Sequence, residues 1–198
     1  MDEEVISYFS SEDKTQILEM WKRHTMRQLK IAKVVVHMGV GASGERLEKG
    51  IKVLESLTNQ KPIKLLARKT IRDFGIRKGE PITAKVTLRG EKAIEFLQRA
   101  LTVVENKIKY SSIDNNGNIS FGITEHIELP ETTYEPSLGI FGLDVCINVK
   151  HPGYRISERR KYKRKVPKKH RVSKLETMIF LNTQLGVEIV KEYVISYY

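Results

Sequence analysis

Three glycines follow a short apolar run, and their spacing could support nucleotide chemistry. Residues 37–47 read HMGVGASGERL, so Gly39, Gly41 and Gly44 fit the pattern Gly-x-Gly-x-x-Gly. Between a strand and a helix, this pattern can place a pyrophosphate at the helix N-terminus. The same glycines could instead serve only to let the chain turn sharply from a strand into a helix. The elements around them must distinguish these two interpretations.

The expected strands favour the second interpretation, because their apolar residues alternate. Across residues 81–89, the apolar Ile82, Ala84, Val86 and Leu88 alternate with polar or charged residues. A dinucleotide-binding sheet is covered by helices on both faces, and its strands are continuously apolar. The acidic residue that such a site needs about 20 residues later is also missing, because the next strand ends in LLARK. With no catalytic arrangement of nucleophile, base and acid apparent, we expect neither an enzyme nor a cofactor.

The alternation predicts a two-layer α+β fold, with a mainly antiparallel sheet, helices on one face and an open second face. Strands are expected at residues 31–38, 62–68, 81–89, 118–129 and 143–150. Helices are expected at residues 12–30, 44–58 and 91–105, with Ile94 on the apolar stripe of the third. A last helix should begin at the capping box Ser173-x-x-Glu176 and stop at Gly186. The sequence DNNG at residues 114–117 predicts a turn.

Length and composition fit one domain of 198 residues. We expect a helical segment at 1–30, a core at 31–149, a basic insert at 150–174, and a helix with a tail at 175–198. No apolar window reaches the length of a membrane span, and the acidic N-terminus is not a signal peptide. The single cysteine, Cys146, lies in an apolar run and is expected in or near the core of a cytosolic protein. One cysteine and five scattered histidines predict no metal site.

The net charge of +11 is concentrated in one segment of the chain. Residues 150–174, here called the basic segment, hold 12 Lys or Arg residues and one acidic residue, whereas the remaining residues balance. A polyanion would relieve the repulsion, and nucleic acid is favoured over a membrane surface because the segment has no apolar helical face. A merely solvated segment is the alternative. We expect residues 155–171 to be mobile in the unbound protein and to order on RNA. The cations proposed for RNA contact are Arg159, Arg160, Lys161, Lys163, Arg164, Lys165, Lys168 and Lys169.

The open face of the sheet is a second candidate for RNA binding. In the expected strands its cations are Lys33, Lys64, Arg68, Lys85, Arg89 and Lys150. Thr87 and Gln60 add neutral groups that could reach a 2′-hydroxyl or a base edge. The polar positions of residues 118–129 include His126. An ordinary solvated sheet face would show a similar pattern.

A loop at residues 69–79 carries a third concentration of charge. Its cations are Lys69, Arg72, Arg77 and Lys78, opposed only by Asp73, and Phe74 and Gly75 mark a projecting turn. Phe74 could project from this turn or fold back to anchor the loop. A hairpin tip of this kind is usually just solvated.

Four stretches together resemble the universal large-subunit ribosomal protein L-five family, of the archaeal and eukaryotic branch. They read KVVVHMGVGASGERLEKG, NQKPIKLLARKTIRDFGIRKGEPITAKVTLRG, FGITEHIELPE and GIFGLDVCINV. The resemblance runs from residue 31 to residue 149, plus the last helix, and the basic insert is what favours that branch.

The resemblance implies a cytoplasmic structural protein of the ribosome that binds 5S rRNA in the central protuberance. It also implies contacts with 23S-type rRNA, with P-site tRNA through the 69–79 loop, with a neighbouring protein that binds 5S rRNA, and with a small-subunit head protein. The family's polar RNA contacts fall on His37, Gln60, Thr87 and Arg89, although the family usually has asparagine where this chain has His37. The alternative is a free-standing basic RNA-binding protein without preference for 5S rRNA.

Overall fold

A computed structural model describes residues 9–133 and 135–191, which form two compact units. One unit, here the sheet unit, comprises residues 33–104 and 120–146. The other, here the helical unit, is built from the described parts of segments 1–32, 105–119 and 147–198. The tail expected after residue 191 lies outside the described residues. That the chain is a single domain stays a prediction.

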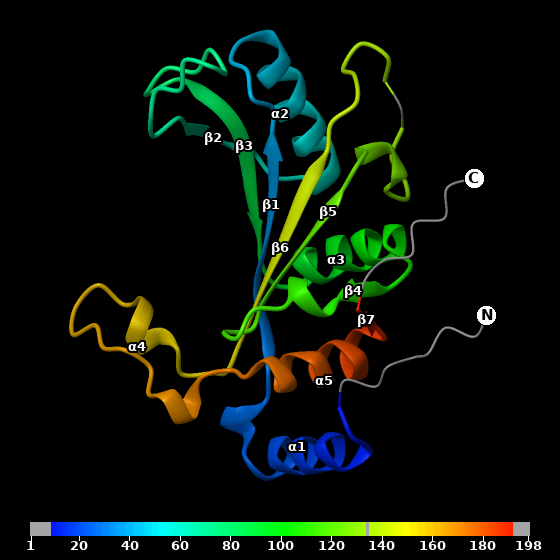
Figure 1. The fold of residues 1–198 in the computed structure, drawn as a ribbon, viewed down its shortest axis with the longest axis vertical. Coiled ribbons are helices and arrows are strands. Elements are labelled where there is room, and N and C mark those ends of the chain that lie inside the picture. The colour runs from blue at the N-terminus through cyan, green and yellow to red at the C-terminus, as the bar shows by residue number, and fades with distance from the viewer. Residues whose placement is uncertain (1–8, 134, 192–198) are drawn as a thin grey trace. The chain divides into compact units, whose positions relative to one another are not determined.

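The main sheet has five strands in the order β2-β3-β1-β6-β5 (Figure 1). They span Lys30–Gly39 (β1), Ile63–Leu66 (β2), Pro81–Leu88 (β3), Asn118–Ile123 (β5) and Leu143–Lys150 (β6). The pairs β1–β3 and β2–β3 are antiparallel. Alternate residues of β1, β3, β5 and β6 are buried, as predicted. These observations confirm the α+β fold.

Helices α2 (Glu45–Thr58) and α3 (Glu91–Val103) both belong to the sheet unit, with α2 at the top of the view in Figure 1 and α3 below it. Arg99 of α3 donates to the carbonyl oxygen of Leu57 in α2 over 3.2 Å. Gly50 brings α2 close to β1, because a Cβ atom at this position would lie 2.9 Å from Sδ of Met38. The absence of a side chain at Gly50 therefore leaves room for Met38 and Val40 beneath the helix.

The helical unit contains α1 (Ser11–Arg23), α4 (Arg155–Glu158) and α5 (Lys174–Leu185). The rings of Trp21 in α1 and Phe180 in α5 pack in a T-shaped arrangement, with their centroids 6.4 Å apart. Strands β4 (Lys107–Lys109) and β7 (Glu188–Val190), which the sequence did not predict, form a parallel pair. The capping box of Ser173 and Glu176 and the left-handed stop at Gly186 are both confirmed.

Two predicted helices differ in detail. The first ends at Arg23 rather than near residue 30, and a 3-10 turn, Thr25–Arg27, follows it before β1 begins. In α3 the side chain of Ile94 is 42% exposed, so its place in the core stripe was wrong. Ala93, Phe96 and Ala100 are the buried positions that complete the stripe with Leu97 and Leu101. The small alanines made this stripe hard to recognise from hydropathy alone.

His126 and Cys146 occupy the opposite environments from those predicted. Strand β5 stops at Ile123, and His126 is 3% exposed in a 3-10 turn where its Nδ1 accepts a hydrogen bond from the Phe141 amide over 3.3 Å. Burial lowers the pKa of His126. Cys146 is exposed, because it alternates with buried Val145 and Ile147 on β6. Strand alternation, rather than the apolar surroundings in sequence, sets the position of this cysteine.

The turn at residues 114–117 is confirmed, and its glycine has two structural roles. Gly117 has φ +79°, and a Cβ atom there would lie 2.9 Å from the carbonyl oxygen of Val149 and 2.9 Å from the Val172 side chain. Gly139 has a similar φ of +86° but open space around its Cα atom. Alanine substitutions at these two glycines can therefore separate the cost of the left-handed backbone from the cost of a steric clash.

We expect Gly117→Ala to destabilise the protein more than Gly139→Ala. Both substitutions carry the left-handed penalty of roughly 1–2 kcal/mol. Only Gly117→Ala adds a clash with backbone, of about 1–3 kcal/mol. The free energy of unfolding of each variant, measured in urea, tests this. Equal losses would contradict the close approach of β6 to this turn.

A second prediction concerns Glu176, which is buried and caps α5. Burial raises the pKa of this carboxyl group, but the His151 ring 3.6 Å away and hydrogen bonds from Ser173 outweigh it and lower the pKa below 4.5. A carboxylate with a lowered pKa stabilises the fold above pH 4.5 and loses this effect as the pH falls through its folded-state pKa. Glu176→Gln should therefore cost about 1.5–3 kcal/mol at pH 7 and much less at pH 3. Urea unfolding across this range measures the difference, and a pH-independent cost would contradict the prediction.

Candidate nucleic-acid interface

The outward side chains of β1 and β3 form one continuous surface of the sheet unit, here called the sheet face. Antiparallel pairing places His37 opposite Lys85 and Val35 opposite Thr87. Lys33 lies one position beyond the pair formed by Val34 and Leu88, at the end of β3 where Arg89 follows. Residues directly opposite each other in an antiparallel pair share a face. The structure thus brings together five of the predicted RNA-binding residues, namely Lys33, His37, Lys85, Thr87 and Arg89.

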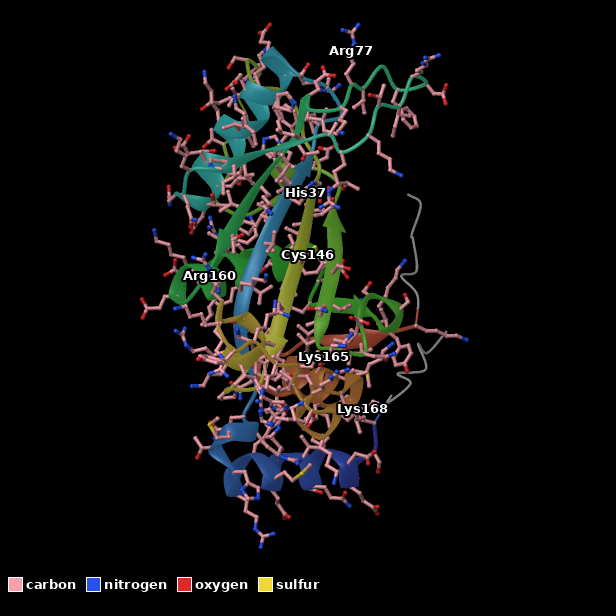
Figure 2. All side chains as sticks on the ribbon, turned by 90° about the vertical axis from the view of Figure 1, so that its left-hand side faces the viewer. His37, Arg77, Cys146, Arg160, Lys165 and Lys168 are labelled. Atoms are coloured by element: carbon pink, nitrogen blue, oxygen red, sulfur yellow. The ribbon has the colours of Figure 1, made fainter. Side chains whose placement is uncertain are left out.

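His37 has a partner that the sequence analysis missed. Its Nδ1 atom lies 3.2 Å from Oδ2 of Asp144 on the neighbouring strand β6, and Figure 2 shows His37 and Cys146 on these adjacent strands. The Asp144 carboxylate therefore holds one ring nitrogen of His37 and leaves Nε2 toward the open face. A contact of His37 with RNA stays a prediction. Because Asp144 alternates with buried residues on β6, the sequence alone could have placed it on the same face of the sheet as His37.

Cys146 lies two residues from Asp144 on the same strand. Burial by its neighbours, with a further effect of the Asp144 carboxylate, raises the pKa of the Cys146 thiol. The thiol is therefore protonated at neutral pH, and a protonated thiol is a weak nucleophile.

Gln60 lies beside Thr87, as the predicted site requires. Its Nε2 atom donates to the backbone carbonyl oxygen of Thr87 over 3.3 Å, across 27 residues of sequence. Gln60 directly follows Asn59, which ends α2 in the left-handed conformation with φ +48°. The end of α2 therefore places the exposed side-chain amide of Gln60 at the edge of the sheet face. The side-chain hydroxyl of Thr87 is not needed for this contact.

The predicted orientation of Lys64 was wrong. Register pairs Lys64 with the buried Ala84, which places it on the helix-covered side, where its Nζ atom contacts Glu48 of α2. The neighbouring apolar residue Ile63 lies opposite Lys85 and is 63% exposed. β2 is a four-residue edge strand at the margin of the helix layer, so an ion pair can cover its inner side. In a strand, such a one-residue difference exchanges the two faces.

Two further cations predicted for the open face lie elsewhere. Arg68 follows β2 and is exposed in the loop that leads to the 69–79 loop. Lys150 belongs to the helical unit, where its Nζ atom lies 2.8 Å from Oε1 of Glu158. Neither residue is a member of the sheet face as the structure defines it.

The 69–79 loop is a defined hairpin with an exposed tip. Ile71 and Ile76 exchange two backbone hydrogen bonds of 2.9 and 3.0 Å, and Gly75 turns the chain with φ +65°. Phe74 is 74% exposed, so it projects and does not anchor the loop. Figure 2 shows Arg77 extending away from the sheet unit. The other predicted cations of the loop, Lys69, Arg72 and Lys78, are also exposed.

The base of this hairpin is tied to the glycine turn. The Glu80 carboxylate accepts hydrogen bonds from the Ser43 hydroxyl and from the Arg77 amide, and these two bonds lower the pKa of Glu80. Gly41 and Gly44 have φ values of +72° and +84°, and the Gly41 amide donates to the Ile82 carbonyl oxygen over 3.1 Å. The glycines thus shape a loop that joins β1, α2 and the hairpin base.

The basic segment exposes all eight of its predicted RNA-binding cations. Arg159, Arg160, Lys161, Lys163, Arg164, Lys165, Lys168 and Lys169 are each exposed, and Figure 2 shows Arg160, Lys165 and Lys168. Val166 and Val172 are buried beneath them, at 7% and 1% exposure. The two valines anchor a segment that has little regular structure apart from α4 and the 3-10 turn Lys168–His170. Its mobility in the unbound protein stays a prediction.

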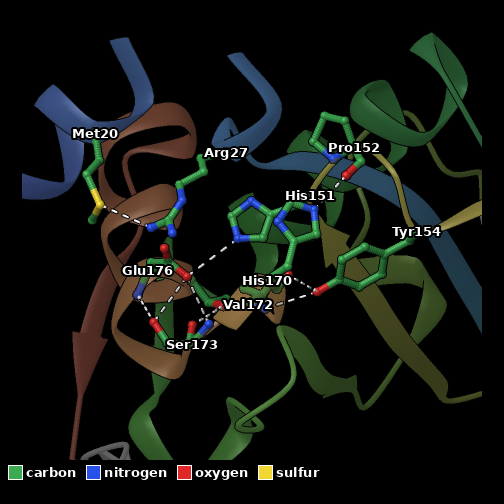
Figure 3. A network of polar contacts seen from close by, with 10 residues as sticks. Met20, Arg27, His151, Pro152, Tyr154, His170, Val172, Ser173 and Glu176 are labelled. Carbon is green, nitrogen blue, oxygen red and sulfur yellow. Dashed lines mark hydrogen bonds and ion pairs between the residues drawn. The ribbon is translucent and has the colours of Figure 1, made fainter. Parts of the chain in front are cut away.

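Aromatic and acidic residues fix the two ends of the basic segment (Figure 3). The hydroxyl of Tyr154 donates to the His170 carbonyl oxygen and accepts from the Val172 amide, both over 3.0 Å. The rings of His151 and His170 stack with centroids 5.2 Å apart. Nε2 of the buried His151 lies 3.6 Å from the Glu176 carboxylate. The sequence analysis assigned the capping role of Glu176 but not these partners.

Among residues 9–133 and 135–191, no group of three or more His, Cys, Asp and Glu side chains could hold a metal ion. Within the same ranges, no helix has both the length and the apolar character needed to cross a membrane.

Comparison with known proteins identifies the family. The family model described as Ribosomal protein L5 matches residues 24–77, and the model of the C-terminus of the same ribosomal family matches residues 81–180. Large ribosomal subunit protein uL5 of Aeropyrum pernix is 53% identical over 89% of this chain and 92% of its own length. The protein of the same name from Sulfurisphaera tokodaii is 52% identical over 84% and 94%, and that from Archaeoglobus fulgidus is 50% identical over 87% and 98%.

The glycine turn lies within the first matched region, and members of this family are structural components of the ribosome, not enzymes. The two matched regions cover more than half of the chain, and the identities are high over nearly its whole length. The chain therefore belongs to the ribosomal protein L5 family.

Proposed function

We propose that this chain is a structural constituent of the large ribosomal subunit that binds 5S rRNA through the sheet face. The relatives named large ribosomal subunit protein uL5 support the assembly. The observation that carries the RNA site is the register of β1 and β3, which aligns Lys33, His37, Lys85, Thr87 and Arg89 on one surface. Gln60 is fixed beside Thr87 by a 3.3 Å hydrogen bond.

This surface suits structured RNA because it mixes cations with fixed neutral groups. Lysine and arginine contact phosphates and provide affinity, whereas groups held in a fixed geometry distinguish sugars and base edges. Thr87 and Lys85 lie on a strand whose other face is buried, so their backbone positions are fixed. The sheet face can therefore provide selectivity that phosphate contacts alone cannot.

The other surfaces have separate roles in this proposal. The basic segment binds rRNA, including 23S-type rRNA, mainly through phosphates. The hairpin at 69–79 contacts P-site tRNA with its exposed tip. A neighbouring protein that also binds 5S rRNA and a small-subunit head protein complete the proposed set of partners. The basic composition and the exposed Phe74 support the first two roles.

We expect variants of the sheet face to reduce the preference for 5S rRNA over an unrelated structured RNA of similar length. Arg89→Ala removes a charge-assisted contact worth roughly 1.5–3 kcal/mol, and Thr87→Val should cost less. Lys64→Ala is the matched control, because this cation faces α2 and should leave the preference unchanged. Competition binding over a salt series measures both affinity and preference.

The same salt series separates the basic segment from the sheet face. Replacing Arg160, Lys161 and Lys163 by glutamine should weaken binding to both RNAs alike. The log–log salt slope should flatten by about 0.7 for each phosphate that is no longer neutralised on a single strand. If this variant abolishes the preference while Arg89→Ala and Thr87→Val retain it, the assignment of roles is reversed. Binding to both RNAs with no preference in the unmodified protein would favour a free-standing basic RNA-binding protein.

Phe74→Ser tests the hairpin. Phe74 is 74% exposed, so its replacement should leave stability and 5S rRNA affinity unchanged. Because the tip is proposed to meet tRNA, ribosomes that carry the variant should hold P-site tRNA less tightly. Filter binding of tRNA to assembled ribosomes measures this effect. A loss of 5S rRNA affinity comparable to that of Arg89→Ala would place the hairpin on the 5S rRNA surface instead.

A further inference from the structure

Tyr162 is unusual among the aromatic residues of this chain. Its side chain is 85% exposed, more than that of any other large hydrophobic residue described. It also has φ +52°, in the left-handed region that non-glycine residues seldom adopt. Within residues 9–133 and 135–191, no ring contact or side-chain hydrogen bond of Tyr162 contributes to the fold. The fold therefore gains little from an aromatic ring at a position where asparagine or glycine would be less strained.

The loop around Tyr162 is held in shape by backbone contacts. The Arg164 amide donates to the Ile156 carbonyl oxygen over 2.9 Å, which closes the loop between them. Inside this loop, Nε of Arg159 donates to the Tyr162 carbonyl oxygen over 3.0 Å. α4 precedes the loop, and buried Val166 follows it. The ring is thus presented outward from a closed loop, not from a loose chain.

The surroundings of the ring are cationic. Lys161 and Lys163 flank Tyr162 in sequence, and both are exposed, as are Arg160 and Arg164. Cations next to an exposed aromatic ring match the two parts of a nucleotide, a phosphate and a planar base. Double-stranded RNA offers phosphates but keeps its bases stacked, whereas an unpaired base can stack on a tyrosine.

From these observations we infer that Tyr162 is a stacking platform for one unpaired RNA base, with Lys161 and Lys163 binding the adjacent phosphates. The inference rests on the proposed RNA-binding role of the basic segment and adds a ligand type to it. The cations around Tyr162 bind the phosphates of paired and unpaired RNA alike, whereas the Tyr162 ring binds only an unpaired base. The basic segment therefore recognises an RNA bulge or loop in preference to a continuous helix.

The test uses the full chain and two RNA stem-loops that differ at one position. One carries a bulged 2-aminopurine, and in the other the same 2-aminopurine is paired with uridine. Tyr162→Asn removes the ring but keeps a residue that tolerates positive φ, and Tyr162→Phe keeps the ring. Tyr110→Leu is the control, because the Tyr110 ring is already covered by Lys174, whose Nζ lies 3.4 Å from the ring centroid.

We expect Tyr162→Asn to weaken binding to the bulged RNA by about 5- to 150-fold, the loss typical of one base–aromatic stack. Affinity for the paired RNA and the salt slope should not change, because no charge is removed. The unmodified protein and Tyr162→Phe should quench the bulged 2-aminopurine, and Tyr110→Leu should behave like the unmodified protein. Equal affinities of Tyr162→Asn and the unmodified protein for the bulged RNA would overturn the stacking role alone. Absence of binding to either RNA by the unmodified protein would overturn the proposed RNA-binding role of the basic segment as well.

Discussion

The strict alternation of side chains along β1 and β3 is the constraint on which the rest of the sheet unit depends. Val34, Val36 and Met38 of β1 are fully buried, so the residues between them must face outward. The same holds for β3, where Ala84, Val86 and Leu88 are buried. The two-residue period of the strands therefore determines both which side chains form the core and which form the sheet face. Any slip in register would exchange them, which the well-packed helix layer prevents.

Close packing under that layer and a sharp turn of the chain account for three of the glycines. Gly50 allows α2 to approach Met38, and Gly41 and Gly44 let the chain turn from β1 into α2. The hydrogen bond from Ser43 to Glu80 then ties this turn to the base of the 69–79 hairpin. The glycine motif here shapes a turn that is hydrogen-bonded to the base of the hairpin. The chemical role of a glycine pattern is thus decided by what the resulting loop contacts.

The basic segment shows how a chain with strong self-repulsion can still be held in place. Its eight predicted RNA-binding cations are exposed, while its fixed points are apolar or aromatic: Val166, Val172, and the stacked rings of His151 and His170. Tyr154 connects the two ends by accepting from one backbone group and donating to another. Because these cations are exposed, their mutual repulsion is screened by salt and can be relieved further by a polyanionic partner. Anchored ends and a charged surface make a segment that can present single residues such as Tyr162.

Local periodicity and backbone hydrogen bonding were enough to predict the α+β class, the faces of β1, β3 and β6, and the capping box at Ser173. The four family-like stretches also pointed to the correct family. Features that depend on partners distant in sequence could be known only from the three-dimensional arrangement of the chain. Lys64 contacts Glu48 because β2 lies at the sheet edge, and His37 contacts Asp144 because β6 lies beside β1. His126 became buried because β5 ends early and Phe141 satisfies its ring nitrogen. A periodic pattern states which residues share a face, but strand order and register decide which groups meet there.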